Sequence, residues 1–445
     1  MQASNPDTPA QIQRLPGWLA GIRFGPALLV SLAVGGLIRL LYVLLVFGAT
    51  DPALSGDGVG YHFDALRLAD GLGYTAALWD VGAESAHHPP GWVTLLAGVS
   101  ALGFDTIHEH QLLGVLIGML VIGVSAVIGR LFFGDLAGAA AGAIAAVYPG
   151  FWVLDAQILS EPLALVLLGA SIIALYQFSR QPDVRHALVF GVFIGLTTLT
   201  RPEQLALLVF LLPALWRARQ LSYLRRAMLA LLVFAVVTLL ITPWAVYNAN
   251  RFDVPVLISA NMGTGLLVGN CAKTFSGEKR GFYHMGCLKH GMKSENPGDS
   301  AMADRRNLHA AIDQIRSNLD KLPMTIVARY GRAFGLYRTD HTVTEVAKWH
   351  GTAKWPVWAW VISFWFVAVL AIVGATAAIR ARIDISPLAI SVLIMLGVVG
   401  VFYGEPRYHT MADLSLVVLA GFGLVKICLW KSGVSTDLLL HPPDR

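Results

Sequence analysis

Ten long apolar segments constrain the fold of this chain more than any other feature. The first, residues 25–48, contains a single charged residue, Arg39, and the other nine contain none. About 20 apolar residues are needed to cross a bilayer, so the pattern predicts an all-α polytopic membrane protein. The nine uncharged segments are 112–129, 136–152, 162–179, 187–200, 204–216, 227–247, 355–379, 385–404 and 414–425.

An eleventh apolar segment, residues 91–104, is shorter than most of the others. Its 14 residues fit either a short span or a helix that lies at the membrane interface. We therefore expect a helical bundle with about 10 or 11 transmembrane helices. Only 14% of the residues are charged, against about a quarter in soluble domains. This composition excludes a water-soluble globular enzyme.

Basic residues set the expected orientation. The 33 Lys and Arg exceed the 28 Asp and Glu, but they lie in short clusters between the apolar segments. This distribution excludes a nucleic-acid-binding face and, by the positive-inside rule, predicts a cytoplasmic N-terminus. Most loop cations then fall on inner connections: Arg130, Arg180, Arg185, Arg217, Arg219, Arg225, Arg226, Arg380, Arg382, Lys426 and Lys431. The short outer connections hold only Arg67, Arg201 and Arg407.

The same topology divides the chain into consecutive parts. Segment 25–48 is about twice as long as the apolar part of a cleaved signal peptide, which predicts a retained anchor. Chemistry is expected on the two hydrophilic loops that face the outer compartment. The expected parts are a cytoplasmic N-terminal segment (1–24), an N-terminal membrane module (25–248) with a first outer loop (50–90), a large outer loop (249–354), C-terminal membrane helices (355–431) and a cytoplasmic tail (432–445).

Carboxylates at the outer ends of the predicted helices are the candidate catalytic groups. Asp57 follows the first span closely, and Tyr61 falls on the same face of a helix four residues later. Asp155 and Glu161 bracket a short outer turn, where a carboxylate positions an acceptor hydroxyl or holds a divalent cation. Each has a plainer interpretation. Asp57 suits a turn or helix N-cap, and Glu161, followed by Pro162, suits a helix N-terminus.

Cationic groups at the same face suit a phosphate. His88 directly precedes Pro89 and Pro90, which favour an extended backbone, and Arg201 and Arg407 lie at outer helix ends. Two guanidiniums that face one outer cavity bind a phosphate or diphosphate leaving group well. The alternatives are a surface role for His88 and snorkelling of the two arginines to lipid head groups.

Two further features concern structure. Arg39 lies inside the first span, where a charge needs a partner, and Asp413 near the outer end of the last span is a candidate. Cys271 and Cys287 lie 16 residues apart in the large outer loop. They form a disulfide in an oxidising compartment, the alternative being two free thiols.

Short motifs occur in a fixed order along the chain: ADGLGYT, HPPGW, LSEPL, LTRP, TPWAVYN and a late RY. With their predicted sidedness, they resemble the integral-membrane glycosyltransferases of the GT-C superfold. The closest resemblance is to the family 39-like group of bacterial envelope proteins, which is related to protein O-mannosyltransferases and lipid A aminoarabinose transferases. It covers nearly the whole chain, although each motif alone is short and degenerate.

The resemblance implies roles for particular residues. Asp57 takes the place of the first-loop catalytic carboxylate and Glu161 that of the second acidic position, with Asp155 less favoured. Many relatives have Arg or Lys where this chain has His88, and Arg where it has Tyr247, so one donor-side cation is missing here. The residues implied to bind the donor phosphate are Tyr61, His88, Arg201, Arg407 and Tyr408.

The implied reaction is transfer of a sugar from a polyprenyl-phosphate carrier to a hydroxyl acceptor on the outer face of the cytoplasmic membrane, with inversion. The acceptor is a lipid, a polysaccharide or a protein. The scheme requires no metal or other cofactor, although a divalent cation is compatible with it. Membrane lipids, and not nucleic acids, are the expected partners. The alternatives are a transporter or flippase for an envelope lipid or sugar, whose ionisable groups usually lie near the bilayer midplane, and a catalytically silent membrane partner.

Overall fold

A computed structural model describes residues 21–47, 56–78, 81–288 and 299–431. Within these ranges the chain forms 17 α-helices and no strand, apart from one isolated bridge between Thr75 and Glu84. The predicted all-α fold class is confirmed. Most of the expected N-terminal segment (1–24) and the whole expected cytoplasmic tail (432–445) lie outside the described residues.

Helices occupy all ten predicted apolar segments. Six of them are long and apolar enough to cross a membrane. These six are α3 (Phe24–Leu41) with the π-helical turn η1 (Tyr42–Phe47), α6 (Ile107–Phe133), α9 (Glu161–Arg180), α12 (Tyr223–Ala249), α17 (Lys354–Arg380) and α19 (Thr410–Lys431) with the turn η5 (Pro406–His409) before it. The chain is thus a multi-pass membrane protein.

The other four predicted segments are shorter or broken. The helices α7 (Asp135–Val147) and α8 (Pro149–Asp155) form one pair bent by 52°. The apolar helices α10 (Val184–Thr200) and α18 (Ser386–Val401) have fewer than 18 residues, and segment 204–216 divides into the 3-10 helix η3 (Pro202–Phe210) and α11 (Leu211–Arg217). Pro149 lies at the bend of the first pair and Pro202 opens η3, which agrees with the helix-breaking effect of proline.

The eleventh apolar segment forms a helix that is short for a membrane span. It forms α5 (Pro90–Ser100), whose 11 residues extend over about 16 Å at 1.5 Å per residue. That length is roughly half of the hydrocarbon core. Pro90 occupies the first helical position, where its missing N–H costs nothing.

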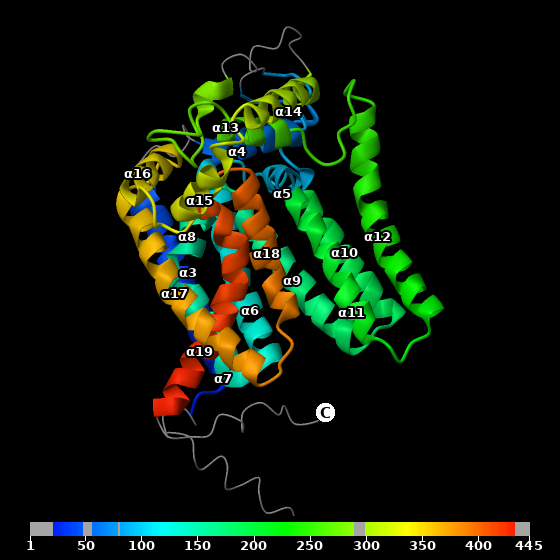
Figure 1. The fold of residues 1–445 in the computed structure, drawn as a ribbon, viewed down its shortest axis with the longest axis vertical. Coiled ribbons are helices and arrows are strands. Elements are labelled where there is room, and N and C mark those ends of the chain that lie inside the picture. The colour runs from blue at the N-terminus through cyan, green and yellow to red at the C-terminus, as the bar shows by residue number, and fades with distance from the viewer. Residues whose placement is uncertain (1–20, 48–55, 79–80, 289–298, 432–445) are drawn as a thin grey trace, which may run out of the picture.

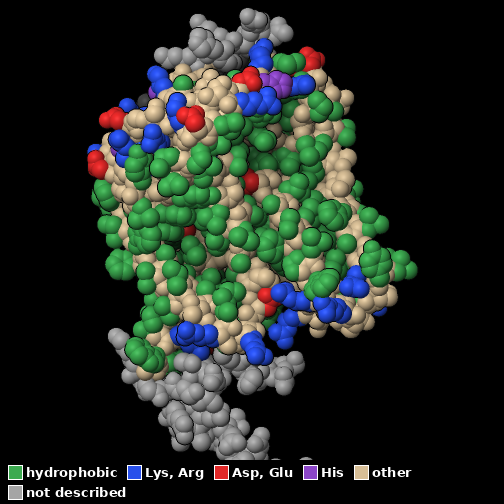
Figure 2. Space-filling model, viewed as in Figure 1, with side chains coloured by type: hydrophobic (Ala, Val, Ile, Leu, Met, Phe, Trp, Pro, Cys, Tyr) green, Lys and Arg blue, Asp and Glu red, His purple; other side chains and the backbone are tan. Residues whose placement is uncertain are grey.

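The two ends of the bundle differ in composition. Figure 1 shows α4 (Gly56–Ala69), α5, α13 (Met262–Gly269) and α14 (Ser300–Arg316) at one end, and α7 with the last turns of α19 at the other. Figure 2 shows a broad hydrophobic band between the charged ends, with Lys and Arg at both and with Asp, Glu and His mainly at the upper one. We call the end formed by residues 56–100, 250–288 and 299–353 the loop end.

Small residues allow the central helices to approach closely. A Cβ added to Gly138 of α7 would lie 2.7 Å from the carbonyl oxygen of Ala126, and one added to Gly374 of α17 would lie 2.0 Å from that of Leu419. Such contacts are typical of helix packing in membranes, where burial from water does not drive association. Packing thereby explains the small residues 138–142 of α7, whose sequence is GAAAG.

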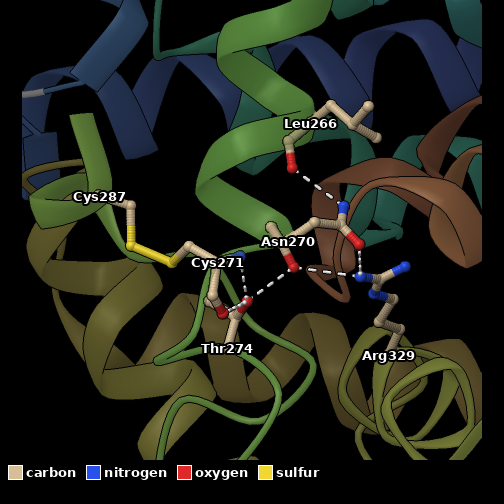
Figure 3. Close-up of a disulfide and its surroundings, with 7 residues drawn as sticks. Leu266, Asn270, Cys271, Thr274, Cys287 and Arg329 are labelled. Atoms are coloured by element: carbon tan, nitrogen blue, oxygen red, sulfur yellow. Dashed lines mark hydrogen bonds between the residues drawn. A yellow bond between two sulfur atoms is a disulfide. The ribbon is translucent and has the colours of Figure 1, made fainter. Parts of the chain in front are cut away.

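The large loop of residues 249–354, which the sequence predicts to face outside and which we continue to call the large outer loop, folds as a helical unit closed by a disulfide. It contains α13, the short 3-10 helix η4 (Met285–Leu288), α14, α15 (Leu322–Ala333) and α16 (Thr339–Trp349). Cys271, two residues beyond α13, is bonded to Cys287 in η4 (Figure 3). The predicted disulfide is confirmed.

Candidate active site

Helix ends bring four predicted site residues to the loop end. Asp57 lies in the first turn of α4 and Glu161 is the first residue of α9. Arg201 is the C-cap of α10, and Arg407 lies in η5 directly before α19. Pro162, Pro202 and Pro406 follow or precede three of these residues, and proline starts or stops helices at such positions. The sequence thus fixes these side chains at helix termini.

These residues form one network of charges, which we call the Arg407 cluster: Asp57, Glu161, Arg201, Glu203 and Arg407. Arg407 Nη1 lies 2.6 Å from Asp57 Oδ2, and its Nε donates to Glu161 Oε1. Arg201 Nη1 lies 2.8 Å from the same Glu161 oxygen, and Arg201 Nε lies 2.6 Å from Glu203 Oε1. Sequence reasoning predicted the face on which four of these residues meet but missed Glu203, although it follows Arg201 by only two positions.

Accessibility separates the two central carboxylates. The Glu161 side chain is 1% exposed, whereas that of Asp57 is 37% exposed. Glu161 Oε2 is buried without a hydrogen-bond partner. Glu161 is therefore placed to hold the two guanidiniums together, and Asp57 is the carboxylate that a substrate can reach.

The cluster keeps Asp57 ionised. Burial is the largest single influence and opposes ionisation of Asp57. Attraction to the Arg407 guanidinium, a hydrogen bond from it and the neighbouring His88 and His350 together outweigh burial and hold the pKa of Asp57 well below its usual range. Asp57 is thus a carboxylate at neutral pH. It is a weak base while Arg407 stays bound to it, because the ion pair stabilises the charged form.

His88 lies against the cluster as a neutral group. Its ring stacks on Tyr61 with centroids 3.9 Å apart, and the Tyr61 hydroxyl donates to Ser160 Oγ at 3.3 Å. Burial, helped by neighbouring His87, lowers the pKa of His88 to about 3. At neutral pH the imidazole can donate a hydrogen bond to a phosphate but brings no positive charge. Tyr408, the other predicted donor-side residue, packs edge-on against Tyr403 at 4.8 Å.

Asp155 is not part of the Arg407 cluster. Its Oδ2 lies 2.6 Å from Arg39 Nε, and both side chains are almost fully buried. Arg39 is therefore paired with Asp155 and not with Asp413, which lies 2.8 Å from His409 Nδ1. Asp155 therefore has a buried partner outside the Arg407 cluster.

A second acid and base pair adjoins the site. His350 Nε2 lies 3.3 Å from Glu405 Oε1, and both side chains are buried. Sequence reasoning did not single out Glu405 as a site residue. Its place two residues before Arg407, in the stretch YGEPRYH of residues 403–409, was the one sequence feature that pointed to the site. Within the described ranges, no three His, Cys, Asp or Glu side chains lie together as ligands for a metal ion.

The buried imidazole of His62 predicts a pH dependence of stability. His62 Nδ1 lies 3.0 Å from His110 Nδ1, and burial followed by the proximity of His110 lowers the pKa of His62 to about 4. An unfolded histidine has a pKa of about 6.5, so between pH 4 and 6.5 the unfolded state binds more protons. We expect the thermal stability in detergent to be full above pH 6.5 and to fall as the pH drops toward 4.

Comparison with a variant isolates this contribution. Asp64 on the same helix acts in the opposite direction, because burial raises its pKa to about 6 and its protonation favours the folded state as the pH falls. Asp64 is present in both wild type and His62→Gln, so its contribution drops out when the Tm values of the two proteins are subtracted at each pH. The wild type should lose more of its Tm than the variant between pH 7 and pH 5, and equal losses would contradict the assignment.

Comparisons with known proteins agree with this fold. Residues 87–247 match the sequence model of the family described as dolichyl-phosphate-mannose-protein mannosyltransferase. The apo oligosaccharyltransferase of Archaeoglobus fulgidus has a similar structure, with a TM-score of 0.52 over 91% of this chain at 16% identity. The chain has a GT-C fold. It spans 51% of the length of that enzyme.

Two other comparisons involve lipid phosphates. The same archaeal enzyme, in complex with an inhibitory peptide and a dolichol-phosphate, gives a TM-score of 0.51 at 13% identity and covers 91% of this chain and 50% of its own. The ArnT protein of Cupriavidus metallidurans bound to undecaprenyl phosphate gives a TM-score of 0.37 at 18% identity, covering 87% of this chain and 77% of its own. No curated protein gives a match to this sequence.

Proposed function

We propose that this GT-C chain is a membrane glycosyltransferase that moves a sugar from a polyprenyl-phosphate donor to a hydroxyl acceptor, with inversion. The observation that carries the proposal is the Arg407 cluster, where a reachable carboxylate adjoins two guanidiniums. A nucleophilic hydroxyl needs a base, and a phosphate leaving group needs cations. Both lie at one end of the bundle, where membrane helices begin.

Asp57 acts as the base in this scheme. The acceptor hydroxyl gives its proton to the Asp57 carboxylate while its oxygen forms a bond to the anomeric carbon. The bond from that carbon to the phosphate oxygen breaks, and the electron pair leaves with the polyprenyl phosphate. Attack from the side opposite to the leaving group inverts the anomeric centre.

Arg407 and Arg201 neutralise the departing phosphate. Preorganised donors of this kind contribute a few kcal/mol to stabilising the transition state. Without substrate, Arg407 is bound to Asp57. The negative charge of a donor phosphate competes for Arg407, loosens its ion pair with Asp57 and so raises the pKa of Asp57. Donor binding thereby converts Asp57 from a masked carboxylate into a usable base.

The proposed orientation places the loop end outside the cytoplasmic membrane. At the opposite end Arg217 pairs with Asp384 at 2.6 Å, joining two connections rich in arginine. By the positive-inside rule, short basic connections of this kind stay in the cytoplasm. The donor would then be a lipid carried on the outer leaflet, and the acceptor a lipid, polysaccharide or protein of the envelope.

Transfer of a radiolabelled sugar tests the function. The purified full chain in proteoliposomes is given a panel of polyprenyl-phosphate sugars and envelope acceptors, with and without EDTA. We expect label in the acceptor and free polyprenyl phosphate, also with EDTA, because Arg201 and Arg407 supply the positive charge. A loss of transfer with EDTA would assign a cation, for which the buried Glu161 Oε2 is the available oxygen. No transfer from any donor, with labelled lipid moving between leaflets, would support a flippase instead.

A further inference from the structure

Arg329 of α15 is a buried cation whose hydrogen bonds go to the carbonyl groups at helix ends and not to a carboxylate. Its side chain is almost fully buried, and it forms no ion pair in the part of the chain that the structure describes. Nη1 donates to the carbonyl oxygens of Gly400 at 2.5 Å and Val401 at 3.1 Å. Nη2 donates to the carbonyl oxygen of Gly269 at 3.1 Å and to Asn270 Oδ1 at 2.6 Å (Figure 3).

The backbone acceptors of Arg329 are the C-termini of two helices. α13 ends at Gly269 and α18 ends at Val401. The last carbonyls of a helix lack partners within it and carry about half a negative charge. Two such ends together balance one guanidinium. Burial lowers the pKa of Arg329 to about 10, so it stays charged at neutral pH.

Other contacts hold the segment that follows α18. Asn270 Nδ2 donates to the carbonyl oxygen of Val401 at 3.1 Å, and the N–H of Gly404 donates to the carbonyl oxygen of Gly281 at 2.8 Å. Gly404 lies directly on α15, since a Cβ there would be 2.1 Å from the carbonyl oxygen of Arg329. Residues 400–404 are thus fixed by the large outer loop, and Arg407 follows three residues later.

The disulfide anchors the loop that presents Asn270. Cys271 directly follows Asn270, and its N–H donates to Thr274 Oγ1 at 3.0 Å. The Thr274 hydroxyl in turn donates to the Gly269 carbonyl oxygen at 2.9 Å. The disulfide and these hydrogen bonds therefore hold Gly269 and Asn270, which accept hydrogen bonds from Arg329, in place.

We propose that Arg329 is a positioning residue that sets the place of Arg407 by joining the ends of α13 and α18. The inference rests on the proposed function, in which Arg407 binds the donor phosphate. Arginine suits the task because its planar fork offers five donors at once, whereas a lysine ammonium offers three from a single point. The large outer loop thus acts on the reaction without touching the substrate.

The test compares Arg329→Lys with Arg332→Lys. Arg332 lies three residues further along α15, is equally buried, and donates to Arg280 O at 2.6 Å and Thr342 Oγ1 at 2.9 Å, neither of which belongs to residues 400–407. We expect Arg329→Lys to raise the donor KM and lower kcat/KM by about 10- to 100-fold, the scale of a misplaced binding group. Arg332→Lys should lower Tm to a similar extent and leave the donor KM unchanged.

Binding of undecaprenyl phosphate to the full chain in detergent gives a readout independent of transfer. Arg329→Lys should weaken binding in wild type but have little further effect in an Arg407→Lys background, because the two residues act as one unit. Equal weakening in both backgrounds, or equal effects of Arg329→Lys and Arg332→Lys, would overturn the inference. If wild type neither binds the lipid nor transfers sugar, the proposed function fails instead.

A second variant keeps the test decisive if Arg329→Lys fails to fold. Gly404→Ala leaves the Arg329 side chain and its charge in place. The new Cβ would lie 2.1 Å from the carbonyl oxygen of Arg329, so the backbone at residue 404 and that of α15 must move apart. It should weaken undecaprenyl phosphate binding in the same way. A Gly404→Ala protein with unaltered affinity would contradict the positioning role.

Discussion

Asp57→Asn should lower kcat for sugar transfer by about 10²- to 10⁴-fold, the usual contribution of a general base. The amide keeps the size of the side chain but cannot accept the acceptor's proton at neutral pH. The donor KM should not rise, because the change removes the carboxylate that competes with the donor phosphate for Arg407. A collapse of kcat with a steady or lower donor KM is the signature of the proposed base.

Asp64→Asn is the matched control. Asp64 lies on α4 seven residues after Asp57, and its Oδ1 accepts a hydrogen bond from the N–H of Ala77 at 3.0 Å, outside the Arg407 cluster. Its transfer rate should stay within about twofold of wild type, because Asp64 has no contact with the Arg407 cluster and the amide keeps the size and the acceptor oxygen of the side chain. If Asp57→Asn transfers sugar as wild type does, the base must be sought elsewhere in the cluster, with Glu161 first.

The positions of the apolar helices were predictable because they depend on local sequence. Apolar segments separated by charge mark helices, and the alternation of crossings assigns each helix end to a side. Asp57, Glu161, Arg201 and Arg407 were thereby predicted to share a face. Proline beside three of them reinforced the assignment, since it fixes where helices begin and end.

The pairing within that face was not predictable. Arg407 meets Asp57 across 350 positions and Glu161 across 246, so only the packed bundle decides which carboxylate it binds. The charge state of His88 also depends on packing, because burial and then the proximity of His87 lower its pKa. Residue type and spacing indicate neither the partner of Arg407 nor the charge state of His88.

Length and straightness of the helices were harder to predict than their existence. Segment 136–152 reads as one span but bends by 52° between α7 and α8. The bend carries Asp155 into the bundle, where a Cβ on Gly118 would lie 2.2 Å from its Oδ2 and 2.8 Å from Arg39 Nε. Gly118 leaves room for the ion pair between Arg39 and Asp155. The sequence alone does not show which side chains a glycine in an apolar helix makes room for.

Asp155→Asn should therefore destabilise the protein while leaving its chemistry intact. The change leaves the Arg39 guanidinium buried without its counter-charge, and breaking a buried pair from one side costs about 3–5 kcal/mol. Arg39 also donates to the carbonyl oxygens of Gly35 and Ala146, each at 3.1 Å, so a pair that joins α3, α7 and α8 is weakened. Thermal unfolding in detergent measures the loss, and transfer by the molecules that remain folded should match wild type.

Two comparisons separate a structural pair from a catalytic carboxylate. Asp135→Asn removes the partner of Arg130 in an exposed pair, whose side chains are 52% and 56% exposed, and should cost less than about 1 kcal/mol. The double change Arg39→Met with Asp155→Leu replaces the buried charges by apolar groups and should recover most of the stability that Asp155→Asn loses. If the double variant is stable but does not transfer sugar, loss of stability does not explain the loss of activity. Asp155 would then have a role in the reaction.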